Sequence, residues 1–188
     1  MLKQFIESYQ TFSEEEVEQL IPLFEHRTLN KYDFLIKEGE VCDELSIIES
    51  GYFHSFYYSE EMEEVTFCVN FPKNLSFAYS SFITGEKSKE SIQAITPARV
   101  WVLKKSIIDQ LSQDHIGWTR FFQLIAERQY IELEERVFQF QKFDAQQRYI
   151  NLMEQYPECV QQIPLKYLAS YLGVTQRHLS RIRKQLTY

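Results

Sequence analysis

Cysteine is scarce in this 188-residue chain, and its three copies, Cys42, Cys68 and Cys159, are far apart. This number and spacing exclude a disulfide framework and a Cys-x-x-Cys metal site. No apolar run is long enough to span a membrane, and residues 1–7 contain no apolar core of a secretory signal. We therefore expect a cytoplasmic protein that makes no contact with a membrane.

Catalytic motifs are also missing. The chain has no Gly-x-Ser-x-Gly elbow, no Walker phosphate loop and no His-x-His pair. The scattered residues His26, His54 and His115 do not form a metal or haem set, and we expect no cofactor. The leading interpretation is therefore not an enzyme. A cupin-like metalloenzyme is kept as an alternative because small β-rolls resemble cupin barrels.

Charge is divided unevenly along the chain, whose net charge is −7. Residues 145–188 hold six Lys or Arg and two acidic residues, whereas residues 1–144 hold fourteen basic and twenty-five acidic ones. An acidic body with a basic C-terminal part is typical of a protein in which one region meets phosphate.

Two different sequence patterns follow one another in the first half of the chain. Residues 2–25 have a helical pattern, with Ser13 as an N-cap and Glu16 as the acid of a capping box. Residues 28–103 instead contain short apolar runs divided by turn signals, which predicts a β sandwich, roll or barrel. The clearest expected strands are 45–48, 53–58, 65–69 and 98–103.

A long amphipathic helix is predicted between Asp114 and Phe143, because this segment has no proline and only one glycine, Gly117. Its apolar residues form two rows on different sides. Such a helix can pack on its own β domain and on a partner helix at once. The alternative is one broad stripe on a single core. The residues expected at a dimer interface are Phe121, Leu124, Ile131 and Phe138.

Two shorter helices are expected between Ile163 and Leu186, after a helix from Gln146 that Pro157 ends. Pro164 suits the first turn of the first helix, Gly173 the exit from it at positive φ, and Thr175 the cap of the second. The residues expected to be buried between the helices are Leu165, Leu168, Ala169, Leu172, Leu179, Ile182 and Leu186.

The outer face of the second helix carries polar and basic residues at its start. This arrangement predicts a helix-turn-helix that reads the major groove of double-stranded DNA. Arginine can bind guanine bidentately and glutamine can bind adenine in the same way. The expected DNA-contacting residues are Thr175, Gln176, Arg177, His178, Ser180, Arg181 and Lys184. A ligand-binding module whose helices contact protein is the alternative.

The order of these regions resembles the Crp/Fnr family of transcription regulators, particularly its short Bacteroidetes-type members. Segments 37–51 and 82–94 are similar to the family's β-roll, and the most specific match is 169–183. The resemblance implies an α+β fold with an N-terminal antiparallel β-roll of the cyclic-nucleotide-binding, jelly-roll type. It also implies a sensor domain (1–113), a long dimerisation helix (114–143) and a DNA-binding helix-turn-helix domain (144–188).

Two departures from the family pattern concern the sensor. The Glu that would hold a ribose and the Arg that would hold a cyclic phosphate are missing, and the matching stretches are 76–81 and 88–90. Cyclic AMP binding in the family's manner is therefore not expected, and the cysteine cluster of oxygen sensors is also lacking. The aromatic stretch 71–82 either lines an effector pocket or fills the roll. The expected pocket residues are Phe77, Tyr79, Phe82, Lys87 and Lys89.

A third departure is Arg177, which stands where many members carry Glu in the recognition helix. We expect a half-site unlike that of the cyclic-AMP receptor protein. The predicted function is a homodimeric DNA-binding transcription regulator on a pseudo-palindromic operator. RNA polymerase and an unidentified small effector are further expected partners.

Overall fold

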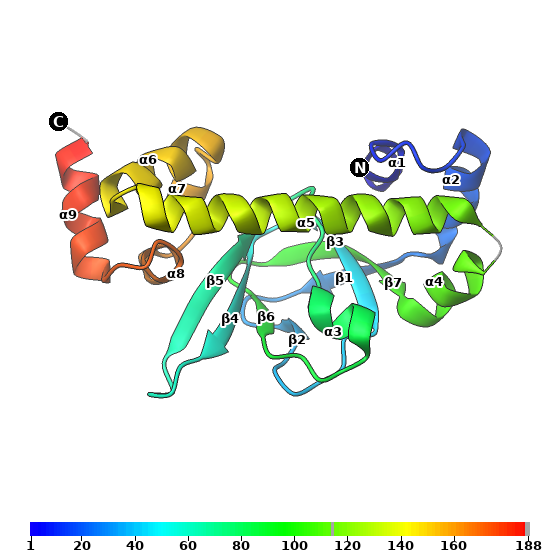
Figure 1. Cartoon of the computed structure of the whole chain (residues 1–188), viewed down its shortest axis with the longest axis horizontal. Coiled ribbons are helices and arrows are strands. Elements are labelled where there is room, and N and C mark those ends of the chain that lie inside the picture. Colours follow the sequence, from blue (N-terminus) through cyan, green and yellow to red (C-terminus); the bar gives the residue numbers. More distant parts are fainter. Residues whose placement is uncertain (114, 187–188) are drawn as a thin grey trace.

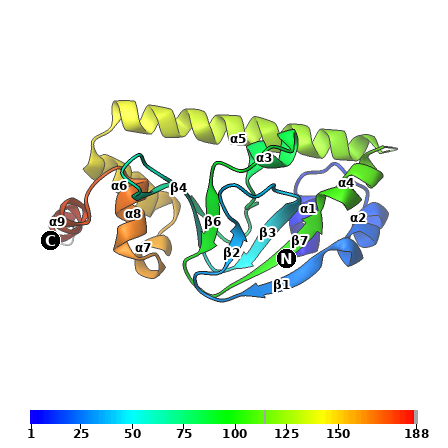
Figure 2. The ribbon, with the colours of Figure 1, turned by 90° about the horizontal axis from the view of Figure 1, so that it is seen from below.

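The structure, a computed structural model, describes residues 1–113 and 115–186. A β-roll and a group of C-terminal helices lie along one side of a long helix, α5 (Ile116–Lys142), as Figures 1 and 2 show from two directions. The predicted α+β class with antiparallel strands is confirmed. Asp114, predicted to begin the long helix, lies outside the described residues, as do Thr187 and Tyr188 of the predicted C-terminal domain.

The N-terminal segment contains the helical structure predicted for residues 2–25, divided into three pieces, and Glu25 already begins the first strand. It forms α1 (Leu2–Glu7), α2 (Glu14–Leu20) and a 3-10 turn, η1 (Ile21–Leu23). The break has a local cause, because Gln10 adopts a positive φ of 55° and Ser13 starts a new helix. The predicted capping box is present: Ser13 N–H donates to Glu16 at 2.7 Å and Ser13 Oγ accepts from Glu16 N–H.

In the described residues, the strands of the roll form two antiparallel sheets with orders β1-β7-β3 and β2-β6-β4-β5. The strands are β1 (Glu25–Leu29), β2 (Phe34–Ile36), β3 (Glu44–Ser50), β4 (Phe53–Tyr58), β5 (Glu64–Asn70), β6 (Ser91–Ala94) and β7 (Ala98–Lys104). Helix α3 (Tyr79–Thr84) lies between β5 and β6, and α4 (Lys105–Ser112) leads from β7 to α5. Register shifts in the β4–β5 and β3–β7 pairs bend the sheets into a roll.

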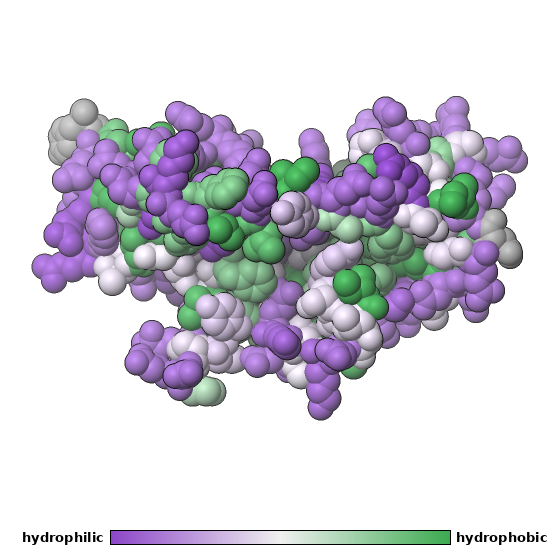
Figure 3. Space-filling view, in the orientation of Figure 1, coloured by the Kyte–Doolittle hydropathy of each residue, from purple (hydrophilic) through white to green (hydrophobic). Residues whose placement is uncertain are grey.

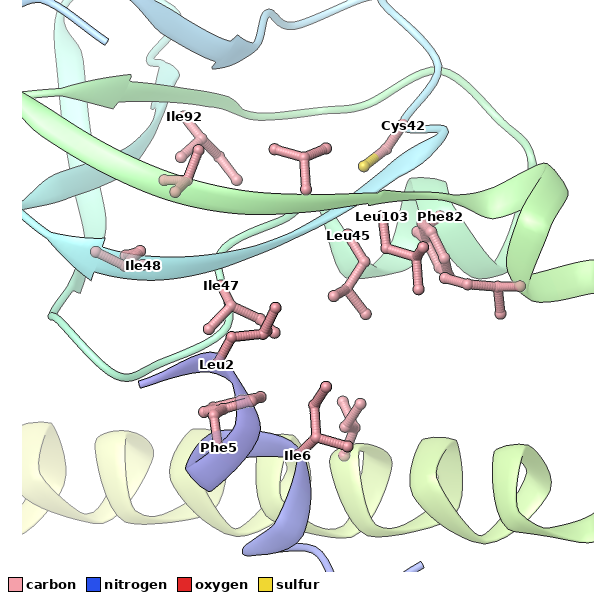
Figure 4. Close-up of a cluster of buried hydrophobic side chains, with 14 of the residues drawn as sticks. Leu2, Phe5, Ile6, Cys42, Leu45, Ile47, Ile48, Phe82, Ile92 and Leu103 are labelled. Atoms are coloured by element: carbon pink, nitrogen blue, oxygen red, sulfur yellow. The ribbon is translucent and has the colours of Figure 1, made fainter. Parts of the chain in front are cut away.

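The main core joins the roll to the N-terminal helices and to the first half of α5. Leu2, Phe5 and Ile6 of α1 point toward Leu45 and Ile47 of β3 (Figure 4). Trp118, Phe121 and Ile125 of α5 complete the same cluster. One end of α5 is thus fixed to the roll by apolar packing.

A second core is made mainly by the C-terminal helices α6 (Ala145–Gln155), α8 (Leu165–Tyr171) and α9 (Gln176–Leu186), and the short α7 (Cys159–Gln162) connects α6 to α8. It also includes residues of the roll, among them Tyr52, Val69 and Phe71. The C-terminal helices therefore pack on the β4–β5 side of the roll. None of the described helices combines the length and the apolar character that a bilayer crossing needs.

Candidate functional site

Helices α8 and α9 are joined by a turn of defined geometry at residues 172–175. Gly173 has a φ of +68°, which confirms the predicted left-handed exit from α8. The Val174 N–H donates to the Ala169 carbonyl at 2.9 Å and closes the turn. Thr175 Oγ1 accepts from the His178 N–H at 3.2 Å, which confirms the predicted cap. The chain therefore fixes the angle at which α9 leaves the turn.

The facing sides of α8 and α9 are apolar and buried. Leu168, Ala169 and Leu172 of α8 pack in one cluster with Leu179 and Ile182 of α9, and each has at most 3% of its surface exposed. The small side chain of Ala169 allows the two helices to approach closely.

Two further residues predicted for this interface are less buried than expected. Leu165, in the first turn of α8, is half-buried and packs against the edge of the cluster. Leu186 is 40% exposed, so the prediction that it is buried was wrong. It is the last residue of α9, one turn beyond the buried Ile182.

The opposite face of α9 is exposed and basic. Gln176, Arg177, His178, Arg181 and Lys184 are all exposed. The flanking Thr175 is exposed as well, and Ser180 is half-buried. The structure thus brings all seven predicted DNA-contacting residues onto one helix and its cap.

The cationic groups on this face are available for a ligand. Within the described part of the chain, the side chains of Arg177, Arg181 and Lys184 take part in no hydrogen bond or ion pair. The sequence of α9 also contains no Asp or Glu, although the whole chain is acidic. An unpaired row of guanidinium and ammonium donors on a rigid helix fits phosphate and base-edge recognition.

Two arginines attach the α8–α9 pair to the neighbouring helices. Arg136 of α5 donates to the Tyr171 carbonyl at 3.1 Å. Arg148 of α6 donates to the Leu172 carbonyl through Nε and Nη2, at 3.2 and 2.9 Å. These carbonyls lie at the C-terminal end of α8, where they lack partners within the helix. The start of α9 is therefore held at a set position relative to α5.

Gly173 also permits a close contact with α5. A Cβ atom at this position would lie 2.7 Å from Cε1 of Phe140, in addition to the strain of its positive φ. We expect Gly173→Ala to lower the free energy of unfolding by about 2–3 kcal/mol in urea titration. Gly85→Ala is the matched control, because Gly85 has a φ of +73° with no atom within 4 Å. Gly85→Ala should lower the free energy of unfolding by only about 1 kcal/mol. Equal losses in the two variants would contradict the contact with Phe140.

The roll holds α8 through one polar and one aromatic contact that the sequence did not suggest. The Thr66 N–H of β5 donates to Ser170 Oγ at 2.8 Å. The ring of His54 packs against that of Tyr167, with centroids 4.2 Å apart. His54 is fully buried, and its position next to α8 depends on contacts that span more than a hundred residues of chain.

His54 is held in its neutral form. Gln93 Nε2 donates to the Tyr32 carbonyl, so Gln93 Oε1 faces the histidine and accepts from His54 Nε2 at 3.3 Å. His54 Nδ1 lies 3.2 Å from Thr66 Oγ1. Burial lowers the pKa of His54 to about 4, because the charged ring would lose its hydration, and nearby Lys166 acts in the same direction. The docking surface for α8 is thus built around a neutral imidazole.

The second half of α5 presents an unpaired apolar face. Ile131 is 53% exposed and Phe138 is 54% exposed, and their neighbours Tyr130, Leu133 and Val137 are exposed as well. Figure 3 shows hydrophobic side chains gathered over the part of the molecule that α5 crosses. Among the other residues predicted for a dimer interface, Leu124 is half-buried.

Phe121 does not belong to this exposed face. Only 5% of its surface is exposed, and its ring packs edge-on against Tyr9 and Trp118 in the core of the roll. Its prediction as an interface residue is corrected accordingly. The apolar pattern that grouped it with Leu124 did not reveal that Tyr9 and Phe12, in the segment between α1 and α2, cover this part of α5.

The predicted effector residues do not form one site. Phe82 is buried in the core and stacks with Phe122, while Lys87 and Lys89 are exposed on the loop after α3. Of the five predicted residues, only Phe77 and Tyr79 are among those that line a cavity of about 260 Å³ between the roll, α5 and the C-terminal helices. The ring of Phe82 packs edge to face with that of Phe77 at 5.1 Å but does not line the cavity, and the two lysines lie outside it, so the five residues do not converge on one site.

Two ionisable residues on the wall of this cavity were not anticipated. Burial raises the pKa of Glu90 to about 7, although a hydrogen bond with Ser55 opposes the shift. Burial also raises the pKa of the Cys68 thiol to about 12, so it is neutral and unreactive near neutral pH. The sequence signal for Glu90 was weak, because an acid in a charged loop is usually exposed.

Comparison with known proteins identifies the fold. Residues 26–115 match the cyclic nucleotide-binding domain family. FixK2 from Bradyrhizobium japonicum is 14% identical, with a TM-score of 0.76 over 87% of this chain and 84% of that one. The regulator CLP of Xanthomonas campestris, described as responsive to c-di-GMP, is 12% identical, with a TM-score of 0.72 over 93% and 92%.

A third similar structure carries the family name. A protein of Eubacterium rectale described as a regulator of the crp/fnr family is 13% identical, with a TM-score of 0.73 over 98% of this chain and 88% of that one. No curated protein matches the chain by sequence. The predicted resemblance to Crp/Fnr regulators is therefore confirmed at the level of the fold.

Proposed function

We propose that the protein is a homodimeric transcription regulator that binds double-stranded DNA with α9. The observation that carries this proposal is the exposed, unpaired basic face at the start of α9, on a helix whose angle is fixed by Gly173 and Thr175. In a helix-turn-helix, the N-terminal residues of the second helix reach base edges in the major groove. Helix α8 would then cross the DNA backbone.

The proposed DNA contacts fall into two kinds. Arg177 and Arg181, one turn apart on α9, would read guanine, and Gln176 would read adenine. Ser180, His178, Lys184 and Thr175 would contact phosphate and set the register. Loss of a base contact should change the sequence preference, whereas loss of a phosphate contact should weaken binding to all DNA sequences alike.

The exposed face of α5 would form the dimer seam. Leu124, Ile131 and Phe138 lie at heptad spacing, which suits helix-on-helix packing. Two copies related by a two-fold axis would place their α9 helices in successive major grooves, about 34 Å apart. In this arrangement, residues 1–113 act as the sensor domain, 114–143 as the dimerisation helix and 144–188 as the DNA-binding domain.

The β-roll would supply control. The stretches 76–81 and 88–90 match the places where cyclic-nucleotide binders carry Glu and Arg but hold neither the Glu nor the Arg in those roles, so the regulator would respond to another small effector or act without one. RNA polymerase is a proposed partner at promoters. A ligand-binding module that contacts only protein is the competing function, and a metalloenzyme is the other. Among the described residues, no group of three His, Cys, Asp or Glu is placed to hold a metal ion.

The test is a selection of DNA sequences from a random pool by the purified full-length protein. We expect a pseudo-palindromic site to be enriched. Arg177→Ala and Arg181→Ala should each weaken its binding by about 10–100-fold and relax one position of each half-site.

Arg120→Ala is the matched control, because Arg120 is an exposed arginine near the start of α5, outside the proposed reader. Failure to enrich any sequence would favour the protein-binding module. Binding that is unchanged in both α9 variants would show that the reader has been assigned to the wrong helix.

A further inference from the structure

The cavity of about 260 Å³ lies where three parts of the molecule meet. The roll contributes Cys68 and Glu90, α5 contributes Arg128 and Arg136, and α8 contributes Tyr171. Figure 1 shows α5 crossing from the roll to the C-terminal helices above this junction. Its volume is slightly below the range of about 300–1,000 Å³ that is usual for small-molecule sites, so it suits one compact ligand.

The two arginines of the cavity are already engaged. Arg128 Nε donates to Glu132 at 2.8 Å, and its Nη2 donates to Asn74 at 3.2 Å. Arg136 donates to the Tyr171 carbonyl, and its guanidinium lies 4.3 Å from the centroid of the Tyr171 ring. Arg128 is thus paired with a carboxylate, whereas Arg136 is bonded to a carbonyl oxygen and lies over aromatic rings.

In the residues that the structure describes, two of the three carboxylates on the cavity wall, Glu90 and Glu135, lack an arginine partner. Glu90 has Ser55 as its hydrogen-bond partner, and no ion pair involves Glu90 or Glu135 in the described part of the chain. A half-buried carboxylate without a counter-charge repels an anion and is stabilised by a cation. The three carboxylates of the wall outnumber its two guanidinium groups, so the cavity disfavours a nucleotide phosphate when Glu90 is ionised.

Aromatic side chains form much of the remaining wall. Phe77 and Tyr79 pack edge to face with centroids 5.6 Å apart, and Phe71 stacks on Tyr156 at 3.9 Å. Ring faces next to a carboxylate are the features that recognise organic cations. A planar ring on the ligand would also bury apolar area against them.

We propose that this cavity binds a small aromatic amine, with the ammonium group at Glu90 and the ring among the aromatic side chains. The proposal rests on the proposed function, in which the roll senses an effector. A ligand here touches the roll, the long helix and α8 together. It would therefore favour one position of α9 if its affinity differs between two arrangements of these parts.

Three probes of similar shape and different charge test the proposal by isothermal titration calorimetry at pH 8, where Glu90 is ionised. They are tryptamine (cationic), tryptophol (neutral) and indole-3-propionate (anionic). We expect tryptamine to bind at least 10-fold more tightly than tryptophol and indole-3-propionate to show no binding. Equal or tighter binding of the anion, or no binding of tryptamine, would overturn the proposal.

The variants Glu90→Gln and Glu86→Gln locate the site. Glu90→Gln should weaken tryptamine binding by about 10–100-fold, because a hydrogen bond to a charged group is lost. Glu86→Gln should leave it unchanged, since Glu86 is exposed and does not line the cavity. An unchanged affinity in Glu90→Gln refutes the site. These titrations contain no DNA, so their outcome is independent of the selection experiment that tests DNA binding.

Discussion

Replacing Ile131 and Phe138 together with glutamate is expected to convert the protein into a monomer and to weaken operator binding by at least 100-fold. Both side chains are more than half exposed in the single chain, so the change should not unfold the subunit. In a dimer seam, by contrast, four carboxylates would be buried near one another without partners, which costs several kcal/mol.

The loss of DNA affinity follows from the loss of the second reader. Linking two binding modules raises the overall affinity by about 10²–10⁴ over a single module when both sites are engaged. Sedimentation equilibrium would measure the mass, and a gel shift on the selected site would measure affinity.

Ile83→Glu is the matched control, because Ile83 is 57% exposed on α3 and does not belong to the proposed seam on α5. This variant should remain dimeric and bind DNA as tightly as the wild type does. A double variant at Ile131 and Phe138 that still sediments as a dimer would rule out the proposed seam.

Acidification from pH 7 to pH 5 is expected to destabilise the docking of α8 on the roll through His54. In the unfolded chain His54 titrates near pH 6.5, whereas burial lowers its pKa in the folded protein to about 4. Between these values the unfolded state binds a proton that the folded state does not, so stability falls as the pH falls. The full difference corresponds to about 3 kcal/mol below pH 4.

Glu90 acts in the opposite direction. Its pKa is raised from 4.5 to about 7 in the folded protein, so the folded state takes up a proton first as the pH falls. This uptake adds stability between pH 7 and pH 4.5 and partly hides the effect of His54. The measurement should therefore be made in the Glu90→Gln background.

Urea titrations at pH 7 and pH 5 would compare Glu90→Gln with the double variant Glu90→Gln/His54→Phe. Phenylalanine keeps a ring between Phe56 and Tyr167 but cannot be protonated. We expect Glu90→Gln to lose about 2 kcal/mol on acidification and the double variant to lose much less. If both variants lose the same free energy of unfolding between pH 7 and pH 5, a group other than His54 controls the stability in acid.

Local patterns in the sequence predicted most of the secondary structure. The capping box at Ser13, the left-handed Gly173 and the cap at Thr175 depend on residues within a few positions of one another, and all three are confirmed. The long helix was predicted because a long amphipathic pattern that no proline interrupts is compatible with few structures other than a helix. Glycine and capping residues act through the backbone, so their effect is readable without the tertiary structure.

Long-range contacts were not predictable in the same way. The sequence could not show that the segment between α1 and α2 covers Phe121, that His54 contacts Tyr167, or that Glu90 and α5 line one cavity. Each of these contacts depends on how separate elements pack. The pattern of residue types within one segment does not show which other segment covers a given face. The same limit explains why Lys87 and Lys89 were grouped with Phe77 although they lie on the exposed loop after α3, outside the cavity.

The attachment of α8 to α5 by Arg136 makes the long helix a lever. At 1.5 Å per residue, its 27 residues extend about 40 Å, with the main core packed at one end and the α8–α9 pair, which also rests on β5, held at the other. A tilt of about 5° at the first end would move the far end by about 3.5 Å, close to the 3.4 Å rise of one base step. In the proposed DNA complex, a small tilt of α5 that also released the contacts of α8 with β5 would thus shift α9 by about one base pair along the DNA.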